Sequence, residues 1–414
     1  MIGANASTPP PLQAPDDVTL GAIASTPSPL QAPDDVPPSL TNDIHGFYEA
    51  KDGTVWCKSV PPPTRTPTSN IFKPPVRQVR NPKNLYTVGD AYKRLINARM
   101  IQKVVCCTDL EGERVYGKNW EKTDATEIEG FVGCLLHLGA LRDNRTTTTV
   151  LGDKTNGNQL LRACFSRNRF LKLSNHLRFD DKSTRQSRRA RDAFAPFREI
   201  WDDFNLNLGK EYIPGPMLTV DEQLMPWRGR CGFLQYLPSK PDKYGLKIFW
   251  ICDADNGYPL HGEPYLGKVG RSREMNIGRN TAIALSDSEP YFGSGTGRNL
   301  TVDHFFTDMA LSTHLLANNI TLLGTVRNNK RFLPNKFQSG EGLKKGNVIF
   351  GFQKKSHTIL AYKSNQKKHV VVISTMHHDD SFDIECRKPE MVSSSLPNHD
   401  DVCHNHAQHT RLKW

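Results

Sequence analysis

Several common features are missing from this chain of 414 residues. No apolar run of about 18 residues or more occurs, which argues against a membrane-spanning helix. Met1–Leu20 lacks a basic segment followed by an apolar one, so we expect no secretory signal. None of the nine cysteines forms a CxxC pair, and such scattered thiols are typical of reduced cysteines in a nuclear or cytosolic protein. We therefore expect neither a membrane partner nor a zinc ribbon.

Positive charge is unevenly distributed along the chain. The first forty residues contain no Lys or Arg, whereas the whole sequence has a net charge of +11 and a pI of about 9.2. A basic body is typical of proteins that bind polyanions, most often nucleic acid, because each phosphate contact releases counterions. A solvated basic surface without a nucleic-acid partner is the alternative, and charge alone does not separate the two.

The N-terminal region is rich in Pro, Ser, Thr and Asp. It contains a nearly perfect tandem repeat, ASTPPPLQAPDDV from Ala6 and ASTPSPLQAPDDV from Ala24. The repeat unit is too short and too proline-rich to build a solenoid. The composition predicts extended, disordered chain over residues 1–80.

Helical periodicity dominates the next part of the sequence. Apolar spacing predicts helices over Ala91–Val105, after Asp124, and over Gln159–Leu177 and Ala193–Leu208. Asp124 and Glu127 have the spacing of a capping box. Lys182–Arg191 contains SRRAR and is interpreted as a basic loop, serving as a nuclear-localisation signal, a phosphate contact or a solvated surface.

From Met217 the pattern changes to short strand-like runs broken by Gly and Pro. The expected strands are Met217–Leu224, Phe233–Leu237, Leu246–Cys252, Tyr258–Leu266, Asn299–Asp303, Thr321–Val326, Val348–Phe352, Thr358–Tyr362 and Val370–Ser374, with a helix at Phe306–Ala317. Close strands followed by strand, helix and strand predict an α/β fold with a mixed sheet, preceded by a helical domain.

Two strand ends carry a similar acidic motif. LTVDEQ ends with Asp221, Glu222 and Gln223, and LTVDHFF contains Asp303. Aspartate is unfavourable inside a strand, and two such carboxylates brought together would favour a divalent cation between them. Mg²⁺ or Mn²⁺ held in this way is the usual solution for phosphodiester cleavage. Turn-forming aspartates at strand ends are the alternative.

Longer motifs around these aspartates resemble the piggyBac transposase family. They are Asp221-Glu222, the WRGR motif at Trp227–Arg230, the KPDKYG motif at Lys240–Gly245 and the YLG ending at Tyr265–Gly267. A second block, TVDHFFTDMALSTHLLANNITLLGTVRNNKRFLP, is similar to the family's VDNFFTS-through-GTxRxNR region. The resemblance extends from about Val88 to Glu390.

The resemblance implies a DNA transposase with an RNase H-like core and a β-rich insertion. Such enzymes cut and join DNA at TTAA sites with Mg²⁺ or Mn²⁺. Asp221 and Asp303 match the first two metal-binding aspartates. Basic residues at motif positions would contact DNA phosphates: Arg228, Arg230, Lys240, Lys243, Arg327 and Lys330. The implied partners are DNA and a second copy of the chain as a homodimer, with no small-molecule substrate, and the implied location is the nucleus.

The sequence departs from the family pattern after Lys388-Pro389-Glu390. The expected GxVDxxDQ motif, which carries the third aspartate, is replaced by MVSSSLPNHDDVCHNHAQHTRLKW. Asp400 and Asp401 fall near the expected position and are weak candidates for the third acid. So abrupt a change suggests a frameshift, an alternative exon or a decayed copy. His304 stands where the family usually has Asn, which fits either a role beside the metal ligand or a tolerated substitution.

These observations predict five regions: a disordered N-terminus (1–80), a helical DNA-binding or dimerisation domain (81–215), an RNase H-like core (216–330), a β-rich insertion (331–388) and a divergent tail (389–414). The expected function is a piggyBac-like transposase, or a derivative impaired by loss of the third aspartate region. Two alternatives stay open: a catalytically inactive DNA-binding protein, and an interaction scaffold that uses the Pro-rich N-terminus.

Overall fold

The computed structural model describes residues 46–62, 70–72, 78–143, 146–267, 275–288, 296–353, 356–383 and 388–389. The tandem repeat, Asp400 and Asp401 lie outside these ranges. The described residues fall within one compact unit, Gly46–Trp414. None of the helices formed by these residues is both long enough and apolar enough to cross a membrane.

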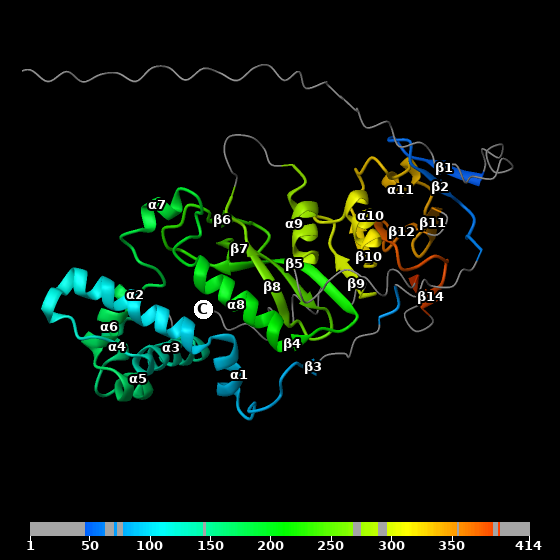
Figure 1. Ribbon diagram of the computed structural model, residues 1–414. Helices are drawn as coiled ribbons and strands as arrows, with labels where there is room; N and C mark the ends of the chain where they lie inside the picture. Colours follow the sequence, from blue (N-terminus) through cyan, green and yellow to red (C-terminus); the bar gives the residue numbers. More distant parts are fainter. Residues whose placement is uncertain are drawn as a thin grey trace, which may run out of the picture. The chain divides into compact units, whose positions relative to one another are not determined.

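A helical region precedes the main sheet in the sequence (Figure 1). It contains α1 (Val88–Leu95), α2 (Ala98–Tyr116), α3 (Ala125–Ala140), α4 (Thr148–Leu151), α5 (Gln159–Cys164), α6 (Arg167–His176), α7 (Arg185–Arg189) and α8 (Arg198–Glu211). Two apolar clusters hold these helices together. One joins α3, α5 and α6 through residues such as Phe131, Leu161 and Leu173. The other packs Met100 and Val104 of α2 against Ile128 of α3 and Ile200 of α8.

Two helices predicted as continuous are each broken in the structure. Asn97 separates α1 from α2, and its side chain accepts a hydrogen bond from the Met100 amide at 3.1 Å. Ser166 begins α6 in the same way, with its hydroxyl accepting from the Arg169 amide at 3.2 Å. Both residues are preferred N-caps, because their side chains satisfy amides that have no partner in the first helical turn. Apolar periodicity alone did not detect these breaks.

The sheet that follows is mixed, and it contains the predicted core strands. Its order is β1-β2-β11-β12-β13-β10-β9-β5-β7-β6, with β8 also paired to β7. The bounds are β1 (Phe47–Glu49), β2 (Val55–Cys57), β5 (Met217–Pro226), β6 (Gln235–Tyr236), β7 (Tyr244–Asp253), β8 (Pro259–Pro264), β9 (Asn299–Val302), β10 (Thr321–Val326), β11 (Val348–Gln353), β12 (His357–Tyr362) and β13 (Val370–Ser374). Two short pairs lie outside this sheet, β3 (Gln78–Val79) with β4 (Tyr212–Ile213), and β14 (Phe382–Asp383) with β15 (Lys388–Pro389).

The strands around β5 have the RNase H-like arrangement. β8, β7 and β5 are antiparallel neighbours, and β5, β9 and β10 are parallel neighbours. β11, β12 and β13, in the expected β-rich insertion, continue this sheet because β13 pairs with β10. The mixed α/β fold with a helical region in front is therefore confirmed.

Helices cover both faces of the core strands. α9 (Ile277–Ser286), which the sequence analysis did not predict, and α10 (Met309–Ala317) contribute Leu285 and Leu311 to a core that includes Val220 and Val302. On the opposite face α8 packs against β8, and Trp201 lies 5.4 Å from Trp250 between ring centroids. Since neighbouring residues of a strand point to opposite faces, β5 places alternate side chains in the two layers.

The disorder predicted up to residue 80 is wrong for the hairpin β1–β2. Cys57 of β2 pairs with Phe352 of β11, which attaches the hairpin to the main sheet. Trp56 is fully buried in the main core and donates its indole N–H to the Phe332 carbonyl at 3.0 Å. The composition of the surrounding Pro-rich sequence hid this hairpin, because only a short apolar segment anchors it. α11 (Asn335–Ser339) completes this side of the fold, with Phe337 fully buried.

Candidate functional site

The register of β5 and β9 places Asp221 and Asp303 at equivalent positions. The two strands are parallel, and Val220 is paired with Val302. Each aspartate directly follows one of these two valines, which are fully buried in the core. Asp303 follows the last residue of β9, whereas Asp221 lies within β5, which continues to Pro226, and not at a strand end as expected. The parallel pairing of the two strands ends at the two valines, and the register places the two sequence-predicted acids next to each other at that point.

Local hydrogen bonds fix the Asp303 carboxylate in a tight turn. One oxygen of its side chain accepts from the Phe305 amide at 2.8 Å, and its carbonyl accepts from the Thr307 hydroxyl at 2.8 Å. The side chain keeps about a fifth of its surface exposed. His304 Nδ1 lies 3.6 Å from an Asp303 oxygen, which is too long for a hydrogen bond. The backbone turn therefore positions Asp303, and His304 does not.

Glu222 adds a third carboxylate to this end of the sheet. Burial raises its pKa, and the charges of Asp221 and Asp303 raise it further, while Lys240 and Lys247 oppose the change. Lys240 Nζ lies 3.4 Å from Glu222 Oε1. Three acidic groups that sense one another in a partly buried setting are a common feature of functional sites. In the sequence Glu222 stands out only as part of the Asp221-Glu222 motif, because its closeness to Asp303 depends on the pairing of β5 with β9.

Lys247 is a second group that sequence reasoning missed. Its Nζ lies 4.6 Å from the centre of the Phe249 ring and 4.5 Å from that of Phe305. Burial lowers the pKa of Lys247, although the nearby carboxylate of Glu222 opposes this. The rings of Phe249 and Phe305 are stacked 6.1 Å apart, and a cation close to both is attracted by both of them. Lys247 belongs to β7 and Asp303 follows β9, so their closeness depends on both strands lying next to β5.

Asp221 and Asp303 together form a donor set that fits a hard divalent cation. Carboxylate oxygens are the protein ligands preferred by Mg²⁺, which commonly uses one or two of them together with water. Among the residues that the structure describes, no group of three or more His, Cys, Asp or Glu side chains is arranged around a common metal position. Asp400 and Asp401, the candidates for a third acid, lie outside the described ranges.

The six predicted phosphate-contact residues lie in two places. Arg228, Arg230, Lys240 and Lys243 belong to the segment between β5 and β7, and Arg327 and Lys330 follow β10. Lys240 and Lys330 form ion pairs within the chain, the latter with Asp308 at 3.0 Å. Arg327, whose guanidinium lies 5.9 Å from the centre of the Phe305 ring, is exposed at the strand end that also holds Asp303.

Asp253 is a buried acid that was not predicted from the sequence, and it lies near the start of β5. Asp253, fully buried at the end of β7, accepts hydrogen bonds from the Tyr212 hydroxyl at 3.0 Å and the Gly215 amide at 2.8 Å. Arg298 donates to the Gly215 carbonyl at 3.0 Å, and burial lowers its pKa to about 10. These bonds join the starts of β5 and β9, so they help to fix the register that aligns the two aspartates.

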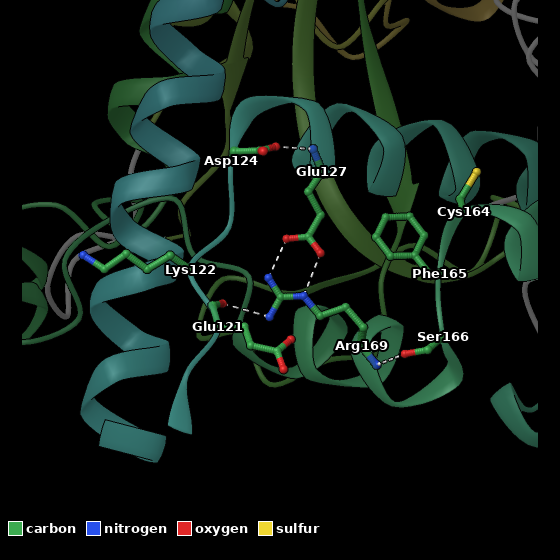
Figure 2. Close-up of a pocket in the computed structure, with 8 residues that line it drawn as sticks. All are labelled: Glu121, Lys122, Asp124, Glu127, Cys164, Phe165, Ser166 and Arg169. Atoms are coloured by element: carbon green, nitrogen blue, oxygen red, sulfur yellow. Dashed lines mark hydrogen bonds and ion pairs between the residues drawn. The ribbon is translucent and has the colours of Figure 1, made fainter. Parts of the chain in front are cut away.

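A hollow of about 500 Å³ lies in the helical region and shares no residue with the strand-end site (Figure 2). Figure 2 shows Arg169 bonded to both carboxylate oxygens of Glu127, and Arg169 also donates to the Glu121 carbonyl at 3.0 Å. The Asp124 side chain accepts a hydrogen bond from the Glu127 amide at 2.8 Å, which is the first bond of the predicted capping box at the start of α3. The Glu127 carboxylate, which would make the second bond of the box, binds Arg169. Glu127 and Arg169 are thus paired with each other across the hollow, and Lys122 pairs with Glu113, which does not line it.

The sequence is similar to a transposase family and to two human proteins. The family model described as transposase IS4 matches residues 89–410. Two human proteins, PiggyBac transposable element-derived protein 3 and the chimeric ERCC6-PGBD3 protein, are each 28% identical over 172 residues, or 41% of this chain. These matches span 28% and 16% of the two human proteins, respectively.

A solved structure resembles this chain over a longer range. It is a cryo-EM structure of the piggyBac transposase synaptic complex with hairpin DNA, with a TM-score of 0.73 and 32% sequence identity. The similarity covers 80% of this chain and 70% of the piggyBac chain. Together with the family match over most of the sequence, it shows that the chain belongs to the transposase IS4 family, as a member of the piggyBac group.

Proposed function

We propose that this protein is a DNA transposase, or a derivative of one, whose strand-cleavage site is centred on Asp221 and Asp303. The register that places the two aspartates side by side, where the parallel pairing of β5 with β9 ends, carries the proposal. The piggyBac structure that it resembles is a complex with DNA, and this supports DNA as the partner. TTAA target sites, a homodimeric assembly and a nuclear location are part of the same proposal.

Asp221 and Asp303 would hold Mg²⁺ or Mn²⁺, and the partly buried Glu222 would reinforce the negative charge that attracts the ion. A bound divalent ion supplies an activated water or hydroxyl group and neutralises the charge that develops on the phosphate. Lys247, which lies close to the rings of Phe249 and Phe305, would attract a phosphate towards the same site. We propose Asp400 or Asp401 as the remaining acid, and its displacement from the family position would impair cleavage.

The basic residues outside the acidic cluster would orient the DNA. Arg228, Arg230 and Lys243 are exposed on one side of the site, and Arg327 is exposed on the other. Phosphate contacts of this kind fix the register of the duplex without reading its sequence. The intramolecular pairs of Lys240 and Lys330 would have to be exchanged for phosphate contacts, so we expect these two residues to contribute less.

Nicking of a supercoiled plasmid that contains TTAA sites tests the proposal. With Mg²⁺ or Mn²⁺, the parent chain should nick DNA, and Asp221→Asn or Asp303→Asn should each reduce the rate about 1000-fold, which corresponds to about 4 kcal/mol in the barrier. Asp287→Asn is the matched control, because this half-exposed carboxylate contacts His314 away from the strand ends. Metal-independent nicking, or equal rates in all four proteins, would refute the assigned site. DNA binding without nicking by the parent would favour the inactive DNA-binding alternative.

A further inference from the structure

Three exposed aromatic side chains lie where β5 and β6 end and β7 begins. The exposed fractions are 45% for Trp227, 52% for Tyr236 and 44% for Tyr244. Tyr236 and Tyr244 are paired across β6 and β7, with ring centroids 4.7 Å apart. The Trp227 amide lies 3.4 Å from the Tyr244 carbonyl, which continues the pairing of β5 with β7. We call Trp227, Tyr236 and Tyr244 the aromatic platform.

The backbone holds the aromatic platform in place. The Trp227 indole lies over Gly229 so closely that a Cβ at that glycine would come within 2.8 Å of the ring. Gly245 has a similarly close contact, because a Cβ there would lie 2.3 Å from the Met225 carbonyl oxygen. Gly229 thus permits the Trp227 ring to approach the backbone, and Gly245 permits the backbones of β5 and β7 to approach each other. Large aromatic side chains that are rigidly held and yet exposed commonly mark a binding surface.

Positive charge surrounds the aromatic platform. Between Pro226 and Gly245 the sequence has four basic residues, Arg228, Arg230, Lys240 and Lys243, and one acidic residue, Asp242. The Arg228 guanidinium lies 6.0 Å from the centre of the Tyr244 ring. Cations interleaved with aromatic rings suit a nucleic-acid strand, since the cations attract phosphates and the ring faces stack bases.

The aromatic platform lies on the same face of the sheet as Asp221. Side chains alternate along a strand, so Asp221, Gln223 and Trp227 of this run share one face. The hydrogen bond from Trp250 to Gln223, at 2.9 Å, joins β7 to β5 on that face. Trp227 lies six residues after Asp221, a span of about 20 Å at about 3.3 Å per residue. This is the length of about six stacked nucleotides at 3.4 Å each.

We propose that the aromatic platform stacks an unpaired base of the DNA strand that reaches Asp221. The proposal rests on the proposed function, because it assumes that DNA is the substrate. The faces of bases inside a duplex are already stacked, so the platform would favour DNA with a displaced or unpaired base over a fully paired duplex. Stacking on aromatic side chains changes affinity by about fivefold to 150-fold per base.

Binding of the full chain to two DNA substrates tests the inference. One is a fully paired duplex, and the other is the same duplex with an unpaired 2-aminopurine about six nucleotides from a TTAA site. The parent should bind the second at least about fivefold more tightly and quench the 2-aminopurine fluorescence. Tyr244→Leu and Tyr236→Leu should each lose most of this preference while keeping the affinity for the paired duplex, and Tyr244→Trp should retain it. Tyr86→Leu is the matched control, because Tyr86 is 84% exposed and belongs to the segment before α1.

The outcomes separate this inference from the proposed function. Tight binding of the paired duplex without preference for the unpaired base would overturn the aromatic platform's role and leave the transposase proposal standing. A preference that survives in both Tyr→Leu variants would place the stacking elsewhere and overturn the inference. Absence of DNA binding by the parent would contradict both proposals. Self-association without DNA that is lost in Tyr244→Leu would assign the surface to a second copy of the chain, and this too would overturn it.

Discussion

Glu111 in α2 and Glu222 in β5 are both largely buried glutamates, yet their surroundings are opposite. The exposed fraction of the side chain is 3% for Glu111 and 19% for Glu222. Glu111 binds Arg114, Arg178 and Lys182, with nitrogen–oxygen distances of 2.8 to 2.9 Å. Glu222 has Lys240 at 3.4 Å and, near it, the carboxylates of Asp221 and Asp303.

The pKa values of the two glutamates move in opposite directions. Burial raises the pKa of Glu111, but the bonds from Lys182 and Arg114 and the charge of Arg178 outweigh it and lower the pKa to about 2. Burial and the neighbouring acids raise the pKa of Glu222. The negative charge of Glu111 in the helical region is neutralised by three cations of the chain. Around Glu222 three carboxylates lie close together, and fewer cations of the chain neutralise them. The first pattern stabilises a fold, and the second suits a site that receives a cation.

The basic segment SRRAR follows the helical pattern. It was predicted as a loop, but Arg185–Arg189 form α7. Asp180, which is 5% exposed, binds Arg185 and Arg188, the latter at 2.5 Å. Two of the arginines that suggested a nuclear-localisation or phosphate-binding loop therefore satisfy a buried acid. Sequence spacing could not reveal this, because it does not show which acid is buried beneath the segment.

The largest effect on stability is expected from Glu111→Gln. This change leaves three cations around a buried site without their shared carboxylate, and losing one partner of such a group costs about 3 to 5 kcal/mol. We expect a loss at the lower end of that range, because Arg114 and Lys182 remain partly exposed to water. Urea unfolding would measure it. Glu113→Gln, at a half-exposed residue paired with Lys122 at 3.2 Å, is the control and should change stability by less than about 1 kcal/mol.

A pH titration of stability sharpens the same contrast. Because the pKa of Glu111 is lowered to about 2 in the folded chain, its contribution is present above the ordinary glutamate value and is lost as the pH falls towards 2. A shift of this size corresponds to about 3 kcal/mol. Between pH 5 and pH 2 the parent should therefore lose more stability than Glu111→Gln. Parallel stability curves for the two proteins would show that the three cations do not act through Glu111.

The smallest effect, of opposite sign, is expected from Glu222→Gln. Since the pKa of Glu222 is raised in the folded state, ionisation opposes folding as the pH rises through the glutamate range. At pH 7 without divalent ions the variant should be at least as stable as the parent in urea unfolding. With Mn²⁺ present, the parent should gain more stability than the variant. A clear destabilisation of Glu222→Gln without metal would mean that its bond to Lys240 is mainly structural.

Local patterns predicted much of the sheet. Thr321–Val326 and Val370–Ser374 were predicted with the bounds that β10 and β13 have, because β-branched runs between turn residues are distinctive. Asp221 and Asp303 were selected because aspartate is unusual at the end of such a run. What the sequence could not supply is pairing: the proximity of Lys247 to Glu222 and the aromatic platform depend on which strands are neighbours.

Mn²⁺ binding to the full chain tests most directly whether Asp221 and Asp303 share one ion. Electron paramagnetic resonance of free Mn²⁺ would give the affinity of the parent, Asp221→Asn, Asp303→Asn and the control Asp287→Asn. We expect the parent and the control to bind Mn²⁺ equally, and each strand-end variant to bind at least about tenfold more weakly, since even the partners of metal ligands contribute that much. Equal Mn²⁺ affinity in all four proteins would contradict a metal site shared by Asp221 of β5 and Asp303 after β9.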